Sequence, residues 1–267
     1  MTLAGRPTVL EEIVAHKRVE VAARKRRRPP DAVAAAAAAA RVKAARDFQG
    51  ALAAPGLAVI AEIKGASPSA GTIRERYDPV EVARAYEAGG AAALSVLTDE
   101  RYFRGSWEDL EAVARASDLP VLCKEFVVDP YQIDEAGAAG AAAVLLIVGI
   151  LSERELREYL AQARGRGMSA LVEVHTETEV GAALRAGADC IGINNRDLRT
   201  LRVDLETTAR IRPLIPPGIV VVSESGFRRR EQLEWAARVG VDAVLIGTAL
   251  MAGGDPAASL RALRGVR

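Results

Sequence analysis

Lysine, cysteine and histidine are all scarce in this sequence. Only five of its 36 basic residues are lysines, and arginine fills the other 31 positions. Lys17, Lys25 and Lys43 lie within the first 46 residues, so the rest of the chain has only Lys64 and Lys124, each closing an apolar run. An ammonium group can have its pKa shifted toward neutrality and can donate a proton, which a guanidinium does poorly. We therefore expect Lys64 and Lys124 to do chemistry that arginine cannot do; the alternative is that both extend from strand ends into water.

The chain has two cysteines and two histidines. Cys123 and Cys190 lie far apart inside apolar runs, so we interpret them as buried thiols of a reducing cytoplasm and not as a disulfide pair. His16 and His175 are too few for a typical histidine-based metal site. The composition therefore predicts a cytoplasmic protein without metal catalysis, and we expect no cofactor.

An excess of charge and long apolar runs are also missing. The formal net charge is +1, which argues against a general role in binding nucleic acid. No apolar stretch is long and unbroken enough to span a bilayer, and the N-terminus has no apolar region typical of a signal peptide. The basic run at residues 24–28 is interpreted as a solvated helix end, with nucleic-acid binding as the less favoured alternative. We expect a small-molecule partner, with no nucleic acid and no membrane.

Eight short apolar runs are present from residue 57 onward, and a helical pattern follows each of them. Strands that alternate with helices form right-handed βαβ units and a parallel sheet. Eight such units in one chain of this length fit a closed barrel. The sequence therefore predicts an α/β protein with a single-domain (β/α)8 TIM barrel. The strands are expected to centre on Ile60, Leu94, Leu122, Leu145, Val172, Ile191, Val221 and Leu245.

A helical segment precedes the predicted barrel. Thr8 and Glu11 have the spacing of a capping box, and residues 34–40 are all alanine, the strongest helix former. We expect residues 1–46 to form an N-terminal helical extension packed on the barrel, and residues 47–267 to form the catalytic barrel domain. Positions that recur at helical spacing in the extension are Leu10, Ile13, Val14, Lys17 and Val21.

Several predicted helices carry recognisable end signals. At three helix starts a capping residue stands three positions before a glutamate, where it satisfies free backbone N–H groups. Gly89 and Gly187 follow the last turns of two helices, where a left-handed residue is often required. The three pairs are Asp78 and Glu81, Ser152 and Glu155, and Thr176 and Glu179.

Polar side chains gather at the predicted strand ends. In such barrels the reacting groups lie at the carboxyl ends of the strands and in the loops that follow. Strand alternation places Glu62 and Lys64 on one face, and likewise Lys124 and Phe126, so each pair can face the same cavity. Charges at these positions require partners or a ligand, and structural ion pairing across the barrel is the alternative interpretation. The full set is Glu62, Lys64, Lys124, Phe126, Glu173, Asn194, Arg196 and Glu224.

The last two strands end in small residues, Ser-Glu-Ser-Gly at 223–226 and Ile-Gly-Thr-Ala at 246–249. Small residues allow backbone N–H groups to approach an anion, and barrels often bind phosphate after strands seven and eight. Together the two segments indicate a phosphate site. The small polar loop at residues 65–71 is interpreted as either a mobile lid or a long connection. His175 lies on the face of Glu173; we expect a solvated loop histidine, with assistance to proton transfer as the alternative.

Several stretches of the chain match, in order, the motifs of one enzyme family. They are Ile-Ala-Glu-Ile-Lys at 60–64, Ser-Pro-Ser at 67–69, Ala-Leu-Ser-Val-Leu-Thr at 93–98, Tyr-Phe-Arg-Gly-Ser at 102–106 and Lys-Glu-Phe at 124–126. They continue with Leu-Val-Glu-Val at 171–174, Ile-Gly-Ile-Asn-Asn-Arg-Asp-Leu at 191–198, Glu-Ser-Gly at 224–226 and Leu-Ile-Gly-Thr-Ala-Leu-Met at 245–251. On these residues the chain resembles the indole-3-glycerol phosphate synthase family, whose N-terminal extension is similar around residues 17–20.

The resemblance implies a defined reaction of tryptophan biosynthesis. The substrate, 1-(2-carboxyphenylamino)-1-deoxyribulose 5-phosphate, closes a ring and loses CO2 and water to give indole-3-glycerol phosphate. Lys124 matches the family's general acid for ring closure, and Lys64 matches the lysine beside the substrate carboxylate. Glu173 and Glu62 match the carboxylates implicated in dehydration. Which lysine acts as the second acid stays open.

The resemblance also implies how the substrate is held. Phe126 would help to wall the anthranilate ring. Asn194, grouped with the catalytic residues, and Glu224 would bond substrate hydroxyls, and Arg196 would orient neighbouring acids. The phosphate would be bound by Ser67 and by backbone N–H groups of Ser225, Gly226, Gly247 and Thr248.

Three positions depart from the family's common pattern. Gly65 replaces a basic residue, Glu125 replaces an aspartate, and Met251 is not followed by an arginine. Strand alternation should direct Glu125 away from the cavity, so we expect activity to survive. The rival interpretations are another phosphosugar-binding barrel enzyme, either an isomerase or a Schiff-base aldolase, and a non-catalytic phosphate-binding subunit. Whether the protein is a monomer or a homodimer is left open.

Overall fold

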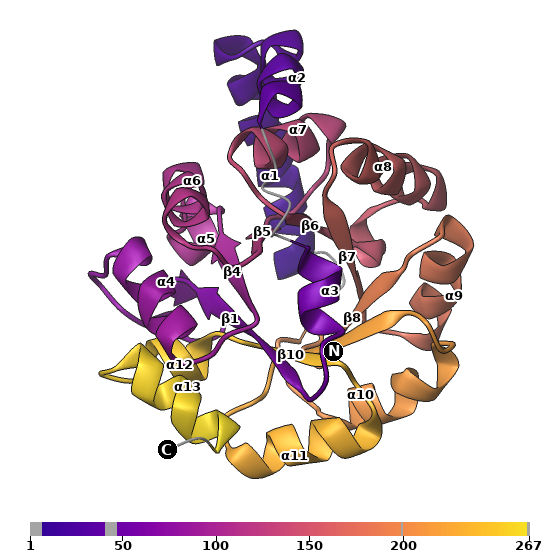
Figure 1. Ribbon diagram of the computed structural model, residues 1–267. Coiled ribbons are helices and arrows are strands. Elements are labelled where there is room, and N and C mark those ends of the chain that lie inside the picture. Colours follow the sequence, from indigo (N-terminus) through magenta and orange to yellow (C-terminus); the bar gives the residue numbers. More distant parts are fainter. Residues whose placement is uncertain (1–6, 41–46, 199, 266–267) are drawn as a thin grey trace.

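A computed structural model of the protein describes residues 7–40, 47–198 and 200–265. In this part of the chain, eight parallel strands form a closed barrel in the order β1-β10-β9-β8-β7-β6-β5-β4 (Figure 1). All eight predicted strand centres lie inside these strands, so the TIM barrel is confirmed. The strands are β1 (Ala58–Ile63), β4 (Ala93–Leu97), β5 (Val121–Lys124), β6 (Ala143–Ile147), β7 (Ser169–Val174), β8 (Cys190–Asn194), β9 (Val220–Glu224) and β10 (Ala243–Ile246).

Helices form a ring around the barrel (Figure 1). The main ring consists of α4 (Pro79–Ala88), α6 (Trp107–Ala116), α7 (Pro130–Ala138), α8 (Glu153–Gly165), α9 (Glu177–Ala186), α10 (Glu206–Ile211), α11 (Arg230–Val239) and α13 (Pro256–Arg264). Shorter elements lie in the loops: α5 (Glu100–Phe103), α12 (Thr248–Met251), the 3₁₀ turns η1 (Val148–Ile150) and η2 (Arg212–Leu214), and a small hairpin of β2 (Ala66–Ser67) and β3 (Gly71–Thr72).

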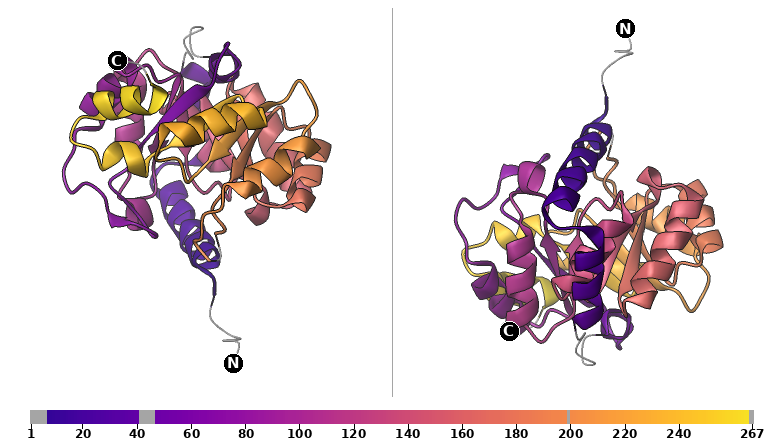
Figure 2. Two further views of the ribbon diagram at one scale, coloured as in Figure 1. Left: turned by 90° about the horizontal axis from the view of Figure 1, so that it is seen from below. Right: turned by 90° about the horizontal axis from the view of Figure 1, so that it is seen from above.

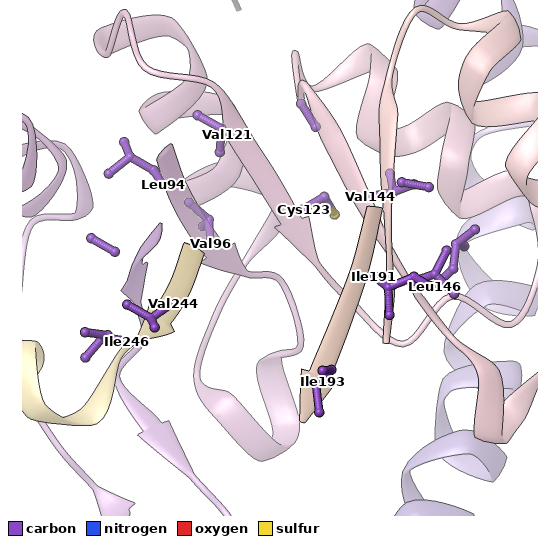
Figure 3. Close-up of a cluster of buried hydrophobic side chains, with 14 of the residues drawn as sticks. Leu94, Val96, Val121, Cys123, Val144, Leu146, Ile191, Ile193, Val244 and Ile246 are labelled. Atoms are coloured by element: carbon purple, nitrogen blue, oxygen red, sulfur yellow. The ribbon is translucent and has the colours of Figure 1, made fainter. Parts of the chain in front are cut away.

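The strands separate two apolar layers because successive side chains point to opposite faces. Inward residues such as Leu122 and Leu171 fill the barrel together with Phe48 and Leu52 of α3 (Phe48–Leu52). Outward residues, including Cys123, pack against the helices (Figure 3). Cys123 thus lies in the outer layer and Cys190 in the inner one, and both are buried free thiols, as predicted.

The predicted helix starts are confirmed. Ser152 and Thr8 each form a reciprocal capping box with the glutamate three positions on. Asp78 accepts hydrogen bonds from the N–H groups of Val80 and Glu81. Thr176 accepts from the N–H of Glu179 at 3.3 Å, but the Glu179 carboxylate bonds elsewhere.

The prediction of a left-handed glycine at a helix end is confirmed at one of the two positions and wrong at the other. Gly187 is left-handed, with φ of 87°, but Gly89 has φ of −80° and the left-handed residue is Gly90, with φ of 85°. A Cβ at Gly89 would lie 3.1 Å from the carbonyl oxygen of Ala257 in α13. Gly89 therefore permits close helix packing, and Gly90 supplies the reversal of the chain.

Among the described residues, α1 (Val9–Arg27) and α2 (Pro30–Ala39) come before α3 and the first barrel strand, while Lys43 falls outside the described residues. The helix α1 lies at one end of the barrel and α3 at the other (Figure 2). The basic run is only partly the predicted solvated end. Arg24 Nε donates to Glu135 of α7 at 3.0 Å, and Lys25 Nζ bonds Asp129 at 2.6 Å.

None of the described helices combines the length and apolar character that crossing a membrane requires.

Candidate active site

A cavity of about 320 Å³ opens at the carboxyl ends of the strands. Every site residue predicted from the sequence lines it, although these residues come from six strands and the loops that follow them. They are Glu62, Lys64, Ser67, Lys124, Phe126, Glu173, Asn194, Arg196, Glu224, Ser225, Gly226, Gly247 and Thr248.

Lys124, the last residue of β5, is held between two carboxylates from other strands. Its Nζ donates to Glu173 of β7 at 2.9 Å and to Glu224 of β9 at 2.5 Å. Lys64, which directly follows β1, donates to Glu62 of that strand. Both lysine side chains are only 13% exposed, so the alternative that they extend into water is wrong. Each lysine faces the cavity in an ion pair.

The three groups around Lys124 differ in proton affinity. Burial alone would lower the pKa of Lys124, but Glu173 and Glu224 outweigh it and raise the pKa above the ordinary value. Burial raises the pKa of Glu224 to about 7, with Glu173 adding to the rise and Lys124 opposing it. For Glu173, burial is outweighed by Lys124 and His175, and the pKa falls. At neutral pH the site therefore holds a charged lysine and an ionised Glu173.

Two glycines make room for these carboxylates. A Cβ at Gly247 would lie 2.2 Å from Oε1 of Glu62, and a Cβ at Gly192 would lie 2.2 Å from Oε1 of Glu224. Any larger side chain at either position would displace a carboxylate that lines the cavity. Gly192 was not singled out from the sequence, because its role depends on the neighbouring strand.

His175 does not fit the expectation of a solvated loop residue. Its side chain is 14% exposed, and its Nε2 lies 3.4 Å from Oε1 of Glu173. Its Nδ1 lies 3.5 Å from Oε2 of Glu179 in α9. The histidine is therefore packed beside the carboxylate on whose face the sequence placed it.

The loop after β8 fixes Asn194 and Arg196. Asn194 Oδ1 accepts a hydrogen bond from the backbone N–H of Arg196 at 3.0 Å, and the Arg196 guanidinium donates to the carbonyl of Leu201 at 2.8 Å. Burial and the nearby Arg228 lower the pKa of Arg196. Leu201 itself has a left-handed backbone, with φ of 60°.

The predicted phosphate segments border the same cavity. Ser225 and Gly226 have positive φ angles of 69° and 101°, so the chain turns sharply there and presents its backbone. The short helix α12 begins at Thr248, where the first N–H groups have no partner within the helix. Ser67 of β2 also lines the cavity, and its Oγ lies 3.4 Å from that of Ser69. All of these segments line the same cavity.

Apolar walls complete the cavity, and the sequence indicated few of them as site residues. Leu10 and Ile13 of α1 line it, as do Leu145 and Ile147 of β6. The alternate spacing within β6 and the apolar stripe of α1 were visible in the sequence. That both sets of residues line the same cavity was not visible in the sequence, because it depends on where α1 packs.

Glu125 was expected to point away from the cavity, but the residue borders it, and its carboxylate bonds other groups of the protein. It accepts hydrogen bonds from Lys17 of α1 at 3.2 Å, from Thr98 at 3.0 Å and from the backbone N–H of Phe126 at 2.7 Å. Phe126 itself is 9% exposed and lies 6.0 Å, between ring centroids, from Phe103. Among the described residues, no group of three or more histidine, cysteine, aspartate or glutamate side chains is arranged to hold a metal ion.

A closed barrel with lysines and carboxylates converging at the carboxyl ends of its strands defines a TIM-barrel enzyme. The sequence model of indole-3-glycerol phosphate synthase matches residues 10–263. The chain belongs to the indole-3-glycerol phosphate synthase family.

Relatives of that name are similar over almost their full lengths. The protein from Mycobacterium avium is 50% identical over 260 residues, which cover 95% of this chain and 92% of the relative. The protein from Mycolicibacterium vanbaalenii is 49% identical, covering 94% and 92% of the two chains. Indole-3-glycerol phosphate synthase 2 of Streptomyces coelicolor is 52% identical, covering 83% and 86%.

Solved structures share the fold at low sequence identity. A 3-hexulose-6-phosphate synthase superimposes with a TM-score of 0.63 at 15% identity, covering 79% of this chain and all of the other. Thiamine phosphate pyrophosphorylase from Pyrococcus furiosus gives a TM-score of 0.61 at 20% identity, with coverages of 82% and 96%. These similarities concern the barrel alone.

Proposed function

We propose that this chain converts 1-(2-carboxyphenylamino)-1-deoxyribulose 5-phosphate into indole-3-glycerol phosphate, CO2 and water, as a carboxy-lyase of tryptophan biosynthesis. Family membership over residues 10–263 supports the reaction. The observation that carries it is the position of Lys124, whose Nζ lies between Glu173 and Glu224 in a cavity that is also lined by the two segments after β9 and β10. The cavity thus combines a proton donor, a carboxylate base and an anion site.

Lys124 is the acid of ring closure. The ribulose carbonyl must gain a proton while the aromatic carbon that carries the carboxylate attacks it. Because Glu173 and Glu224 raise the pKa of Lys124, its ammonium is fully protonated before substrate binds. A compact ammonium can transfer that proton to the carbonyl oxygen, which a guanidinium does poorly.

Lys64 neutralises the substrate carboxylate until CO2 leaves. Its side chain faces the cavity beside Glu62, and both are almost buried, so the ammonium would exchange one carboxylate partner for another. Loss of CO2 restores the aromatic ring. The electron pair of the broken C–C bond remains in the ring system.

Glu173 is the base of dehydration. It accepts the proton from the carbon next to nitrogen, while an acid protonates the departing hydroxyl. Two protons enter the substrate and one leaves, so each turnover takes up one proton, because the carboxylate departs as CO2. Glu173 suits the role since Lys124 and His175 hold its pKa below the ordinary value despite burial. Glu62 is the second carboxylate of this step.

The remaining site residues bind and orient the substrate. Asn194 and Glu224 bond its hydroxyls, Arg196 orients the neighbouring acids, and Phe126 walls the anthranilate ring. The phosphate is held by Ser67 and the backbone N–H groups of Ser225, Gly226, Gly247 and Thr248. Their common location on the cavity wall supports these roles.

The chain is organised as an N-terminal extension, residues 1–46, and a barrel domain, residues 47–267. The extension contributes Leu10 and Ile13 to the cavity, which supports a role in covering the substrate. Two buried free thiols, Cys123 and Cys190, suit a protein of the reducing cytoplasm.

Fluorescence of the indole product, measured with purified protein and the carboxyphenylamino substrate, tests the proposal. The wild type forms product, and Lys124→Arg loses about 10²- to 10⁴-fold in kcat, the usual contribution of a general acid. Lys25→Arg is the matched control, because Lys25 pairs with Asp129 outside the cavity, and it should keep wild-type activity. An inactive wild type sinks the assignment, and an unimpaired Lys124→Arg sinks Lys124 as the acid.

The alternative mechanism, that of a Schiff-base aldolase, predicts a different outcome. An aldolase lysine forms an imine with the substrate carbonyl, and borohydride reduction makes that bond permanent. Mass spectrometry after such treatment should find Lys124 unmodified. A trapped substrate adduct on Lys124 would replace the synthase mechanism with covalent catalysis.

A further inference from the structure

His175 occupies a fixed position between two carboxylates. It follows the end of β7 and lies on the same face as Glu173, two residues earlier. Its Nε2 is 3.4 Å from Oε1 of Glu173, and its Nδ1 is 3.5 Å from Oε2 of Glu179. Nε2 thus faces a carboxylate in the active site, and Nδ1 faces a carboxylate outside it.

Glu179 is anchored independently of the histidine ring. Its Oε2 accepts a hydrogen bond from the backbone N–H of His175 at 2.5 Å, and its own N–H donates to the cap residue Thr176 at 3.3 Å. The carboxylate therefore folds back over the start of α9. A carboxylate fixed beside Nδ1 favours a proton on that nitrogen and determines the orientation of the ring.

The two oxygens of Glu173 have different surroundings. Oε2 accepts a hydrogen bond from Lys124 at 2.9 Å. Oε1 faces His175 Nε2, an atom that is buried and has no hydrogen-bond partner among the described residues. An unsatisfied buried nitrogen is costly, and a shift of a few tenths of an ångström would bring it within hydrogen-bonding distance of Oε1.

We propose that His175 is a positioning residue for Glu173: Glu179 orients its ring, and Nε2–H donates to Oε1 so that Glu173 stays ionised and correctly aimed as the base. This role rests on the proposed function, in which Glu173 takes the proton during dehydration. His175 does not touch the substrate and acts only through Glu173.

The charges around His175 agree with this arrangement. Facing it are Glu173 on β7, Glu179 on α9 and, at longer range, Glu224 on β9. Burial lowers the pKa of His175, but the contact with Glu179 and the charge of Glu173 outweigh it and raise the pKa above the ordinary value. The positive ring in turn lowers the pKa of Glu173, after Lys124.

The pH profile of kcat/KM separates positioning from a structural role. In His175→Ala, Glu173 loses one of its two cations, so the acidic limb should move up by about one pH unit. We expect kcat to fall about tenfold, KM to change little, and added imidazole to restore part of the activity. Glu179→Gln should move the limb in the same direction by less, since the ring is retained but loses its anchor.

The second histidine supplies the matched control. His16 lies on α1 beside Arg101, outside the cavity, so His16→Ala should keep the wild-type pH profile. That variant also leaves a single histidine, whose NMR signal should titrate above the ordinary value of about 6.5. A titration below that value would overturn the proposal.

Failure of this role is distinct from failure of the proposed function. An inactive wild type rejects the function. An active wild type with an unshifted acidic limb in His175→Ala, and no rescue by imidazole, rejects only the role of His175.

Discussion

Glu224 joins the Lys124 cluster at a cost in stability. One oxygen bonds Lys124, while Oε1 is buried without a hydrogen-bond partner among the described residues. Because burial raises its pKa from 4.5 to about 7, the folded state binds a proton in this pH range that the unfolded state has released. The free energy of unfolding therefore falls as pH rises through this window.

Glu224→Gln should remove this pH dependence, because the amide never ionises. The variant should be more stable than wild type at pH 8, by about 1 to 3 kcal/mol, with a smaller difference near pH 5. Urea unfolding at both pH values measures it, and activity should fall since a substrate contact is lost. Glu158→Gln, an exposed change on α8, is the control. A difference of the same size at both pH values would contradict the assignment.

Single residues were predictable where strand alternation decides their direction. Glu62, Lys64, Lys124 and Glu173 face the cavity because side chains of a strand repeat every second residue and barrel sites lie at the carboxyl ends. The same period placed His175 beside Glu173, but its burial depends on Glu179 folding back from α9. Such contacts between elements have no local signal in the sequence.

At the scale of the element, α1 is attached to the barrel by a buried charge. Lys17 is completely buried, and its Nζ lies 2.9 Å from Asp99 and 3.1 Å from Glu125, which follows Lys124 directly. Glu20, on the same helix, supplies a third carboxylate at 2.9 Å. The position of Lys17 on an apolar stripe was the available signal, yet nothing in the sequence named its partners.

Lys17→Met should detach this end of α1. The change keeps most of the side-chain volume but leaves buried carboxylates without their cation, a loss of about 3 to 5 kcal/mol. KM should rise as well, because Leu10 and Ile13 of the same helix wall the cavity. Lys25→Met, which breaks a partly exposed pair with Asp129, should cost about 0 to 1 kcal/mol and leave KM unchanged. Equal losses in the two variants would argue against a special role for Lys17.

The sequence predicted the strands and helices more completely than the turns and loops that connect them. Periodicity located all eight strands, and side-chain caps located the helix starts. Gly89 misled because two consecutive glycines serve different purposes, one for packing against α13 and one for reversing the chain. The β2–β3 hairpin in the first loop was not predicted, since a two-residue pairing leaves no periodic pattern.

At the scale of the whole molecule, anion binding should be linked to unfolding. If inorganic phosphate occupies the site after β9 and β10, a concentration of 100 times its Kd adds about 2.7 kcal/mol to the free energy of unfolding. For a protein of this size that raises Tm by about 5 to 10 °C. Gly247→Ala should abolish the shift relative to its own unliganded Tm. The new Cβ would collide with Glu62, so the backbone at residue 247, whose N–H is a proposed phosphate donor, would have to move. Gly254→Ala, where the Cβ meets open space, should retain the shift, and a full shift in Gly247→Ala would place the phosphate elsewhere.

The closure of the barrel has a consequence for folding while the chain is being synthesised on the ribosome. The strand β1 pairs on one side with β4, the next barrel strand to be made, and on the other with β10, the last. The ribosome adds about 5 to 20 residues per second, so the second edge of β1 stays unpaired for on the order of ten seconds or more before β10 is made. An unpaired edge invites pairing with other chains, so chaperone supply, and not only the stability of the finished fold, should govern how much enzyme a cell obtains.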